Sequence, residues 1–259
     1  MELGLQGRVA VVTGAGRGIG LAVVTALVAE GVHVVAGSLH SSAELEAMAA
    51  EGSVEVLAVD LTEASAPGRL VELAGDRVDI LVNNIGAAPA RTDGFLQVTD
   101  AQWQSSLEVN LLVAVRATRS ALPLMLAAGR GAIVNVASVN ARLPDPTVID
   151  YSAAKAALLS FSKALSKEVG GRGIRVNTVS PGPVATALWL GEAGVAETVG
   201  RAAGLTPREV ADRAAHQSVT GRFTEPSEVA DLVVLLASDR TGNVTGADFT
   251  IDGGLITTI

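Results

Sequence analysis

The residues of this chain best suited to chemistry lie in YSAAK at 151–155, where the only tyrosine of the 259 residues stands four positions before a lysine. The surrounding alanines and leucines favour a helix, and residues i and i+4 of a helix share one face, about 5–6 Å apart at Cβ. A phenol beside an ammonium could exchange a proton with a substrate. The same spacing also fits a surface helix without a function, so other features must decide between the two.

A second group of residues suits a nucleotide. TGAGRGIG at 13–20 follows a run of valines and places Gly14, Gly18 and Gly20 directly before a helical stretch. Glycines allow a tight turn and close approach to a pyrophosphate, and N–H groups at a helix N-terminus bind the anion. A glycine cluster alone also fits a structural turn. After the first strand of a parallel sheet, it predicts a dinucleotide site.

The pattern of apolar runs predicts the scaffold that brings these segments together. Valine- and isoleucine-rich runs without strict alternation, typical of strands buried on both faces, alternate with helical stretches. The expected strands are 8–13, 32–36, 54–59, 78–82, 131–137, 174–179 and 247–251, and the clearest helices are 20–30, 101–128 and 225–238. This order predicts an α/β fold, a doubly wound (Rossmann) parallel sheet of about seven strands.

We expect one domain over residues 1–259, because no linker or low-complexity segment interrupts the chain. The segment 186–222 departs from the alternation. It is predicted to form two short helices, the second with Thr206 as N-cap and Pro207 at its first position. The segment looks inserted. Trp189 and Leu190 within it could form a lid over the substrate or a contact between subunits, and the substrate lid is the preferred interpretation.

Composition narrows the classes of partner. The formal net charge is −8 and no block of lysine and arginine is present, which argues against nucleic acid and against an anionic membrane surface. The chain has no cysteine and its three histidines lack metal-ligand spacing, so we expect no metal site. The chain shows no signal-peptide pattern and no apolar run of about 20 residues, so we expect a soluble cytoplasmic protein.

Further motifs complete the pattern over essentially the whole chain. The full set is TGAGRGIG (13–20), NNIG (83–86), Asn110, Ser138, YSAAK (151–155), PGPVAT (181–186), GRFTEPSEVAD (221–231) and DGG (252–254). In this order, and with 13 residues from Ser138 to Tyr151, they resemble the short-chain dehydrogenase/reductase family. One departure is Ile85, where the family usually has alanine; it would tighten a loop near the cofactor.

The resemblance implies four catalytic residues, Asn110, Ser138, Tyr151 and Lys155. In the family the matching tyrosine transfers the proton, and the matching serine hydrogen-bonds the substrate oxygen. The lysine also binds the ribose hydroxyls, and the asparagine holds a water in a proton relay. A free tyrosine has a pKa of about 10, and we expect the Lys155 ammonium to lower the pKa of Tyr151 toward neutrality. Hydride transfer from a nicotinamide would then interconvert a carbonyl compound and a secondary alcohol.

The resemblance also implies a nicotinamide dinucleotide as cofactor. Besides Tyr151 and Lys155, the residues expected around it are Gly14, Arg17, Gly18, Ile19, Gly20, Ser38, Asp60, Leu61, Asn84, Gly86, Pro181, Gly182, Val184 and Thr186. NAD-specific members of this fold place an acidic residue about 20 residues past the glycine loop, where this chain has Ser38. Arg17 stands where NADP-dependent members often carry a base that pairs with the 2′-phosphate. We therefore expect NADP(H) to be preferred, although the small Ser38 would also admit NAD(H).

The substrate is not identified by the sequence. Apolar residues expected at the pocket suggest an apolar ketone or secondary alcohol, and they are Leu143, Val148, Ile149, Leu188, Trp189 and Leu190. A carrier-linked 3-oxoacyl substrate stays open, because Arg130 and Arg172 could meet an acidic carrier. The negative charge of the chain weakens that idea.

Two other functions stay as alternatives. A sensor or scaffold that binds the cofactor without catalysis should have lost Tyr151 or Lys155, and both are present. An epimerase or dehydratase of nucleotide sugars on this fold would normally be longer and carry GxxGxxG. An active oxidoreductase is therefore the preferred interpretation.

We expect a homotetramer by the same resemblance. In the family, the helices matching 101–128 and 151–169 pair across a dimer interface, and the last strand meets another subunit. Here these helices carry LLVAVRA (111–117) and AALLSFSKAL (156–165), which are apolar beyond one face and would be exposed in a monomer.

Overall fold

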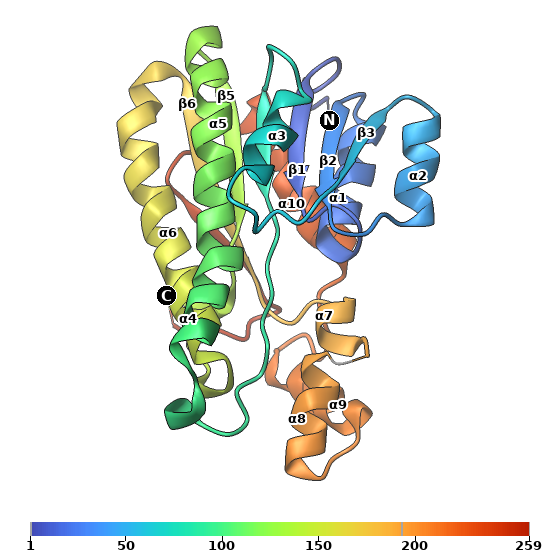
Figure 1. Ribbon diagram of the computed structural model, residues 1–259, viewed down its shortest axis with the longest axis vertical. Helices are drawn as coiled ribbons and strands as arrows, with labels where there is room; N and C mark the ends of the chain where they lie inside the picture. The colour runs from blue at the N-terminus through green and yellow to red at the C-terminus, as the bar shows by residue number, and fades with distance from the viewer. Residues whose placement is uncertain (1, 193, 259) are drawn as a thin grey trace.

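A single parallel sheet forms the centre of the molecule (Figure 1). The computed structural model describes residues 2–192 and 194–258, so Ala193 of the expected lid lies outside the described residues. The strands are β1 (Val9–Thr13), β2 (His33–Ser38), β3 (Val54–Ala58), β4 (Ile80–Asn83), β5 (Gly131–Val136), β6 (Ile174–Pro181) and β7 (Asp248–Ile251). Their order, β3-β2-β1-β4-β5-β6-β7, reverses between β1 and β4. In such sheets a ligand binds at this reversal, at the carboxyl ends of the strands.

Helices cover both faces of the sheet, as the alternating pattern predicts. The helices of the described residues are α1 (Gly18–Ala29), α2 (Ala43–Ala50), α3 (Ala66–Glu72), α4 (Asp100–Leu107), α5 (Val113–Ala128), α6 (Ile149–Val169), α7 (Ala187–Leu190), α8 (Val195–Ala203), α9 (Pro207–Gln217) and α10 (Pro226–Ala237). Successive strand residues face opposite sides. Val12 and Val82 pack with α1 and α10, whereas Val11 and Leu81 pack with α3, α5 and α6. Both faces of the sheet are thus covered by helices and shielded from water, which explains why the strands are continuous apolar runs.

The expected helix 101–128 is interrupted. A π-helical turn, Glu108–Leu112, separates α4 from α5, and Asn110 lies within this turn. Helix α4 begins with a capping box in which Thr99 and Gln102 exchange hydrogen bonds. Because π turns insert one extra residue into a helix and are frequent at functional sites, this irregularity draws attention to Asn110.

The segment 186–222 contains three short helices, α7, α8 and α9, so the prediction of two helices was wrong. The predicted start of α9 is confirmed, since Thr206 caps it and Glu209 completes a capping box. Trp189 of α7 meets Phe223 edge to face, with ring centroids 5.3 Å apart. The three helices lie together below the strand ends in Figure 1.

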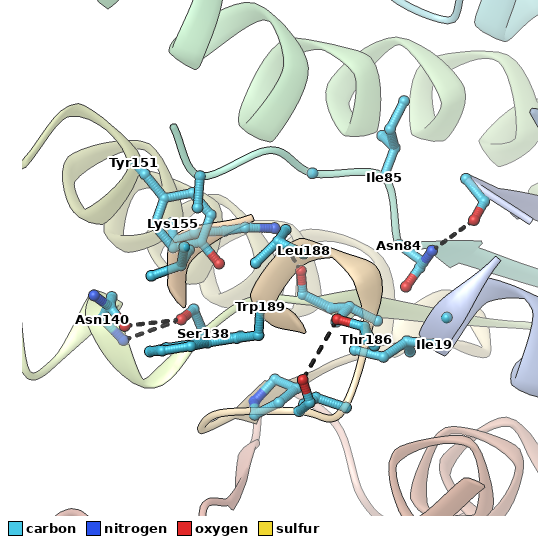
Figure 2. A pocket seen from close by; sticks show the side chains of 18 of the residues that line it. Ile19, Asn84, Ile85, Ser138, Asn140, Tyr151, Lys155, Thr186, Leu188 and Trp189 are labelled. Atoms are coloured by element: carbon cyan, nitrogen blue, oxygen red, sulfur yellow. Dashed lines mark hydrogen bonds between the residues drawn. The ribbon is translucent and has the colours of Figure 1, made fainter. Parts of the chain in front are cut away.

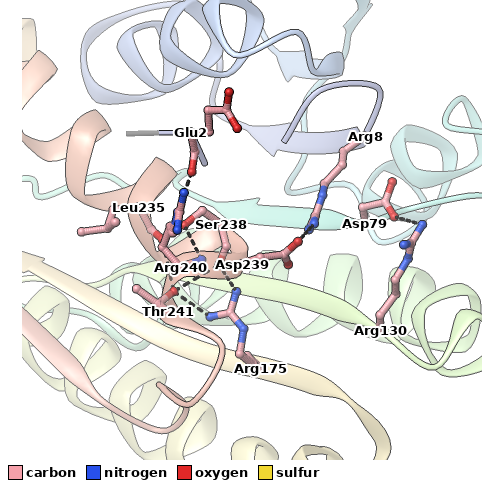
Figure 3. A network of polar contacts seen from close by, with 10 residues as sticks. All are labelled: Glu2, Arg8, Asp79, Arg130, Arg175, Leu235, Ser238, Asp239, Arg240 and Thr241. Atoms are coloured by element: carbon pink, nitrogen blue, oxygen red, sulfur yellow. Dashed lines mark hydrogen bonds and ion pairs between the residues drawn. The ribbon is translucent and has the colours of Figure 1, made fainter. Parts of the chain in front are cut away.

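The opposite end of the sheet is held by an arginine (Figure 3). Arg175 of β6 donates to the carbonyl oxygens of Leu236 (2.8 Å) and Ser238 (3.0 Å), which end α10. The neighbouring Asp239 pairs with Arg8 in front of β1. Burial lowers the pKa of Arg175. These contacts join α10, β6 and the N-terminal segment far from the strands' carboxyl ends.

The stretch Asp100–Ala128 is long and apolar enough to cross a membrane, although the sequence analysis expected no such run. Of its most apolar window, 33% is buried inside the protein. Core helices of soluble proteins pass the same test, so this is weak evidence for a membrane span. The buried side chains of the stretch pack over the sheet with α3 and α6, as those of a core helix do.

Candidate active site

A cavity of about 800 Å³ opens at the carboxyl ends of the strands, between the strand reversal and segment 186–222. Most of the predicted cofactor residues line it, and Gly20 is the exception. Ser138, Tyr151 and Lys155 line it, whereas Asn110 does not. Among the expected substrate residues, Ile149 and Leu190 are absent from the wall, so their prediction was wrong.

The glycine loop needs its glycines. Gly14 and Gly18 have φ of +68° and +56°, a conformation that other residues rarely adopt. A Cβ on Gly20 would lie 2.1 Å from the Gly14 oxygen, and one on Gly18 would lie 3.1 Å from Cγ2 of Thr186. The first turn of α1 carries no acidic side chain. The loop therefore leaves an open helix N-terminus that suits a pyrophosphate.

Asn84 joins the glycine loop to the segment after β4. Its Nδ2 donates to the carbonyl oxygens of Thr13 and Gly14, both at 3.1 Å. Its backbone N–H donates to Oγ1 of Thr13 at 3.0 Å. Since both amide hydrogens are used, Asn84 holds the cofactor cradle together and offers a ligand only its oxygen.

Tyr151, Ser138 and Lys155 come together at one wall of the cavity (Figure 2). Tyr151 and Lys155 lie on successive turns at the start of α6, with Nζ 5.8 Å from the ring centroid. Nζ donates to the Val136 carbonyl oxygen at 2.8 Å. Ser138 follows β5, and its Oγ accepts the N–H of Asn140 at 3.2 Å. The strand end and the helix start thus bring a phenol, a hydroxyl and an ammonium to one place.

Burial disfavours the charged forms of both titratable groups. Burial raises the pKa of Tyr151, and a hydrogen bond with Ser138 opposes this rise. Burial lowers the pKa of Lys155 to about 8. The expected lowering of the Tyr151 pKa is therefore wrong for the protein alone, because desolvation outweighs the stabilisation of the phenolate. At neutral pH Tyr151 is a protonated phenol that can donate.

Asn110 anchors the segment after β4 to the π turn. Its Nδ2 donates to the carbonyl oxygens of Ala87 (2.9 Å) and Ser106 (3.0 Å), and its Oδ1 accepts the N–H of Ala87 (3.1 Å). No amide hydrogen is left to donate to a water. A Cβ on Gly86 would lie 3.0 Å from Oδ1 of Asn110 and 3.3 Å from Nζ of Lys155. The glycine is needed because these two side chains leave little room.

At the other end of the cavity, Arg17 lines the wall together with residues of the turn after β2. Its side chain is exposed, and Ser38 and His40 lie on the same wall. Oγ of Ser38 donates to the His40 carbonyl oxygen at 2.5 Å. A Cβ on Gly16 would lie 2.1 Å from that same oxygen, so the glycine loop and this turn are tightly packed.

Asp60, which follows β3, also lines the cavity. Its Oδ1 accepts the N–H (2.9 Å) and the hydroxyl (2.7 Å) of Thr62, and these bonds lower its pKa. The neighbouring Leu61 is buried in the core. The acceptor is therefore fixed in place as an anion.

This chain is similar in sequence and in fold to known reductases. The family model described as enoyl-(acyl carrier protein) reductase matches residues 14–256. The 3-oxoacyl-[acyl-carrier-protein] reductase of Thermotoga maritima is 33% identical, over 97% of this chain and 99% of that protein. The L-xylulose reductase of Mesocricetus auratus is 36% identical over 100% of both chains. The L-sorbose reductase of Gluconobacter frateurii, solved with NADPH and L-sorbose, superposes with a TM-score of 0.89 at 32% identity over 100% of both chains.

The chain belongs to the short-chain dehydrogenase/reductase family. It is an NAD(P)-dependent oxidoreductase acting on carbonyl and alcohol groups. The alternative of a non-catalytic sensor or scaffold has no support, because the matching relatives are reductases and dehydrogenases.

A buried polar network that the sequence analysis missed supports this dehydrogenase/reductase site. Nδ2 of Asn83 donates to Oδ1 of Asn135 (2.8 Å) and to Oγ1 of Thr118 (3.2 Å). Nδ2 of Asn135 in turn donates to Oγ of Ser162 on α6 at 2.7 Å. The network links β4 and β5 to α5 and α6. A polar residue inside an apolar strand was the signal that could have revealed it.

A second missed feature is an ion pair next to the candidate proton donor. Asp150, fully buried and adjacent to Tyr151, accepts from Nη2 (2.6 Å) and Nε (3.1 Å) of Arg91. The N–H of Arg91 also donates to the Thr147 carbonyl oxygen at 2.6 Å. The pair therefore fixes the segment after β4 against the start of α6. Its partners are 59 residues apart, so no sequence spacing indicates it.

The burial of Lys155 predicts a pH-dependent stability. The unfolded chain keeps the lysine proton up to the ordinary lysine pKa of 10.5, whereas the folded protein releases it at a pKa of about 8. The unfolded state therefore binds more protons between these values, so the contribution of this residue to stability rises with pH there. At neutral pH the buried ammonium costs stability.

We predict that Lys155→Met is at least as stable as the wild type at about pH 7, and that its advantage shrinks toward about pH 10. Urea unfolding over this pH range measures the difference. Lys167→Met, an exposed lysine of the same helix, is the control and should show no such trend. An advantage that grows with pH would contradict the assignment.

Proposed function

We propose that this short-chain dehydrogenase/reductase is an NADPH-dependent reductase of an uncharged ketone. The observation that supports it most is the phenol of Tyr151 beside Ser138, at a cavity reached by the glycine loop; burial raises the pKa of this phenol, so it is protonated at neutral pH. Tyr151 is thus in the protonated form that a reduction requires, and the Lys155 ammonium together with the negative charge that develops on the substrate oxygen helps the phenol to release its proton. Reduction is therefore the favoured direction.

The residues present fit a nicotinamide dinucleotide. Gly14 and Gly18 leave backbone free for the pyrophosphate, and Lys155 lies within the same cavity to bind ribose hydroxyls. When bound, the cofactor supplies the hydride. Oγ of Ser138 accepts the N–H of Asn140, and in the proposed reduction its hydroxyl turns from Oδ1 of Asn140 to donate to the substrate oxygen. Tyr151 then protonates that oxygen, and the Lys155 ammonium stabilises the phenolate left behind.

The segment 186–222 is proposed to act as the lid of this cavity. Leu188 and Trp189 of α7, Val195 of α8 and Ala214 of α9 contribute to the wall. Thr186, the first residue of the segment, lies beside Gly18 of the glycine loop. A lid connected directly to the cofactor loop can exclude water once the cofactor is in place.

The substrate end of the cavity is mostly apolar. Leu143, Val148 and Trp189 line it, in keeping with an uncharged ketone. Arg130 precedes β5 and pairs with Asp79 at 3.4 Å, at the end of the strand opposite to Ser138. Arg172 likewise lies beyond the C-terminus of α6. Within one protomer these arginines therefore lie too far away to guide an acidic carrier into this cavity.

We propose a soluble cytoplasmic homotetramer. Leu112 of the π turn remains 37% exposed, and Leu124 of α5 and Leu159 of α6 are only partly buried. Exposed apolar surface on long helices is typical of subunit contacts.

Static light scattering at micromolar concentration is expected to report about four protomer masses. A mass of one protomer would contradict the assembly and leave the chemistry unaffected.

For catalysis, we predict that Tyr151→Phe lowers kcat by at least about 100-fold, the usual effect of losing a general acid. NADPH binding, followed by nicotinamide fluorescence, should stay largely intact because the ring is retained. Retention of more than about a tenth of wild-type turnover on a confirmed ketone would refute the role of Tyr151.

For the cofactor, we predict that NADP(H) exceeds NAD(H) by at least about tenfold in kcat/KM. Arg17→Ala should weaken NADP(H) binding alone, by about 1.5–3 kcal/mol, because a hydrogen bond to a charged group is lost. Affinities of both cofactors for both proteins measure this. An equal loss for NAD(H) would show that Arg17 does not contact the 2′-phosphate.

A further inference from the structure

Asn140 is a polar residue at the reacting end of the cavity that the proposed reduction does not use fully. Its backbone N–H holds Oγ of Ser138, and its side-chain Oδ1 accepts from the same Oγ at 3.4 Å. Figure 2 shows its side chain against Ser138, on the cavity wall that also carries Tyr151. In the described part of the chain, Nδ2 of Asn140 has no hydrogen-bond partner.

The bond between the two side chains is long and easily exchanged. At 3.4 Å it lies beyond the usual length of a hydroxyl hydrogen bond. When Ser138 turns its hydrogen to a substrate carbonyl, Oδ1 of Asn140 loses its donor. The amide then presents a free acceptor and a free donor beside the reacting oxygen.

A hydroxyl group on the substrate can pair with both the acceptor and the donor of the Asn140 amide. Oxygens on neighbouring carbons lie about a hydrogen-bond length apart, so a hydroxyl next to the carbonyl reaches the amide while the carbonyl oxygen contacts Ser138. The hydroxyl donates to Oδ1 and accepts from Nδ2. Asn140 is only half-buried, so a plain ketone would leave both amide atoms to water, and the hydroxyl would gain the net free energy of one or two neutral hydrogen bonds.

Charge narrows the substrate further. Among the described residues that line the cavity, the charged ones near the substrate end are Lys155 and Asp145. Nζ of Lys155 donates one hydrogen to the Val136 carbonyl oxygen, and in the proposed reduction it also serves the ribose hydroxyls and the Tyr151 phenolate. Oδ1 of Asp145 accepts from the N–H and hydroxyl of Thr147, both at 2.7 Å. No spare cation is present on the described wall for a carboxylate or phosphate on the substrate.

We propose that the substrate is an uncharged ketone with a hydroxyl on the carbon next to the carbonyl, and that the Asn140 side chain recognises this hydroxyl. The inference rests on the proposed carbonyl reduction and gives its substrate class. It assigns Asn140 a specificity role, while its backbone N–H keeps Ser138 in place whatever the side chain.

Acetoin and butanone test the proposal, since they share one carbon skeleton and differ in the neighbouring hydroxyl. The measured quantity is the ratio of kcat/KM for acetoin to that for butanone, with NADPH. The hydroxyl also changes the intrinsic reactivity of the ketone, but this effect cancels when the ratio is compared between variants. We expect Asn140→Ala to lower the ratio by about tenfold, the effect of one or two neutral hydrogen bonds.

Two further variants sharpen the comparison. Asn140→Leu keeps the side-chain size without its polar atoms and should lower the ratio similarly, so a packing defect in the alanine variant cannot mimic the result. Asn243→Ala removes an exposed amide that is absent from the cavity wall and should leave the ratio unchanged. A ratio within about twofold of wild type in both Asn140 variants would overturn the proposal.

The two levels of the proposal fail differently. If both ketones are reduced and the ratio does not depend on Asn140, the substrate class is wrong and the reductase remains. If a protein that binds NADPH reduces neither ketone, the proposed reduction of small uncharged ketones and the inference both fail.

Discussion

The burial of Lys155 beside Tyr151 is the constraint on which the candidate site depends. An ammonium placed in a protein interior costs several kcal/mol unless it is well bonded, and here Nζ donates to the Val136 carbonyl oxygen. The residues around Lys155 must therefore hold its ammonium in position and keep it from turning out into water. The same burial keeps the phenol of Tyr151 protonated, so the site stores a proton until a substrate oxygen gains negative charge.

The scaffold maintains this arrangement by connecting α6 to the carboxyl ends of two strands and to the segment after β4. The network from Asn83 through Asn135 to Ser162 fixes α6 against β4 and β5, and the Arg91–Asp150 pair fixes it to the segment after β4. Asn110 reaches the same segment from the π turn. Removing one partner of a buried pair leaves the other without a hydrogen bond. A substitution of one partner therefore costs more stability than a replacement of both partners by apolar residues. Precision at the site therefore comes from polar contacts, whereas the apolar core supplies the overall stability.

Much of this structure could be predicted from the sequence, because some of its causes are local. The seven strands follow from runs such as RVAVVT at 8–13, and α9 follows from Thr206, Pro207 and Glu209 within four positions. The i and i+4 spacing of Tyr151 and Lys155 placed them on one helix face. What escaped prediction depends on distant residues. The π turn at Asn110, the third helix of segment 186–222 and the Arg91–Asp150 pair arise from tertiary contacts. The direction of the Tyr151 pKa depends on desolvation, which spacing does not reveal.

Titration of Tyr151 tests the central claim most directly, because this residue is the only tyrosine in the chain and its phenolate absorption therefore reports one site. The measurement is the ultraviolet absorbance of the cofactor-free folded protein as pH rises, with Tyr151→Phe as the blank. We expect the phenolate to form only above the ordinary tyrosine pKa of 10.0, since burial raises the pKa of this group. Formation of the phenolate near neutral pH would contradict the account, because it would mean that the Lys155 charge outweighs desolvation and that Tyr151 is poised to accept a proton rather than to donate one.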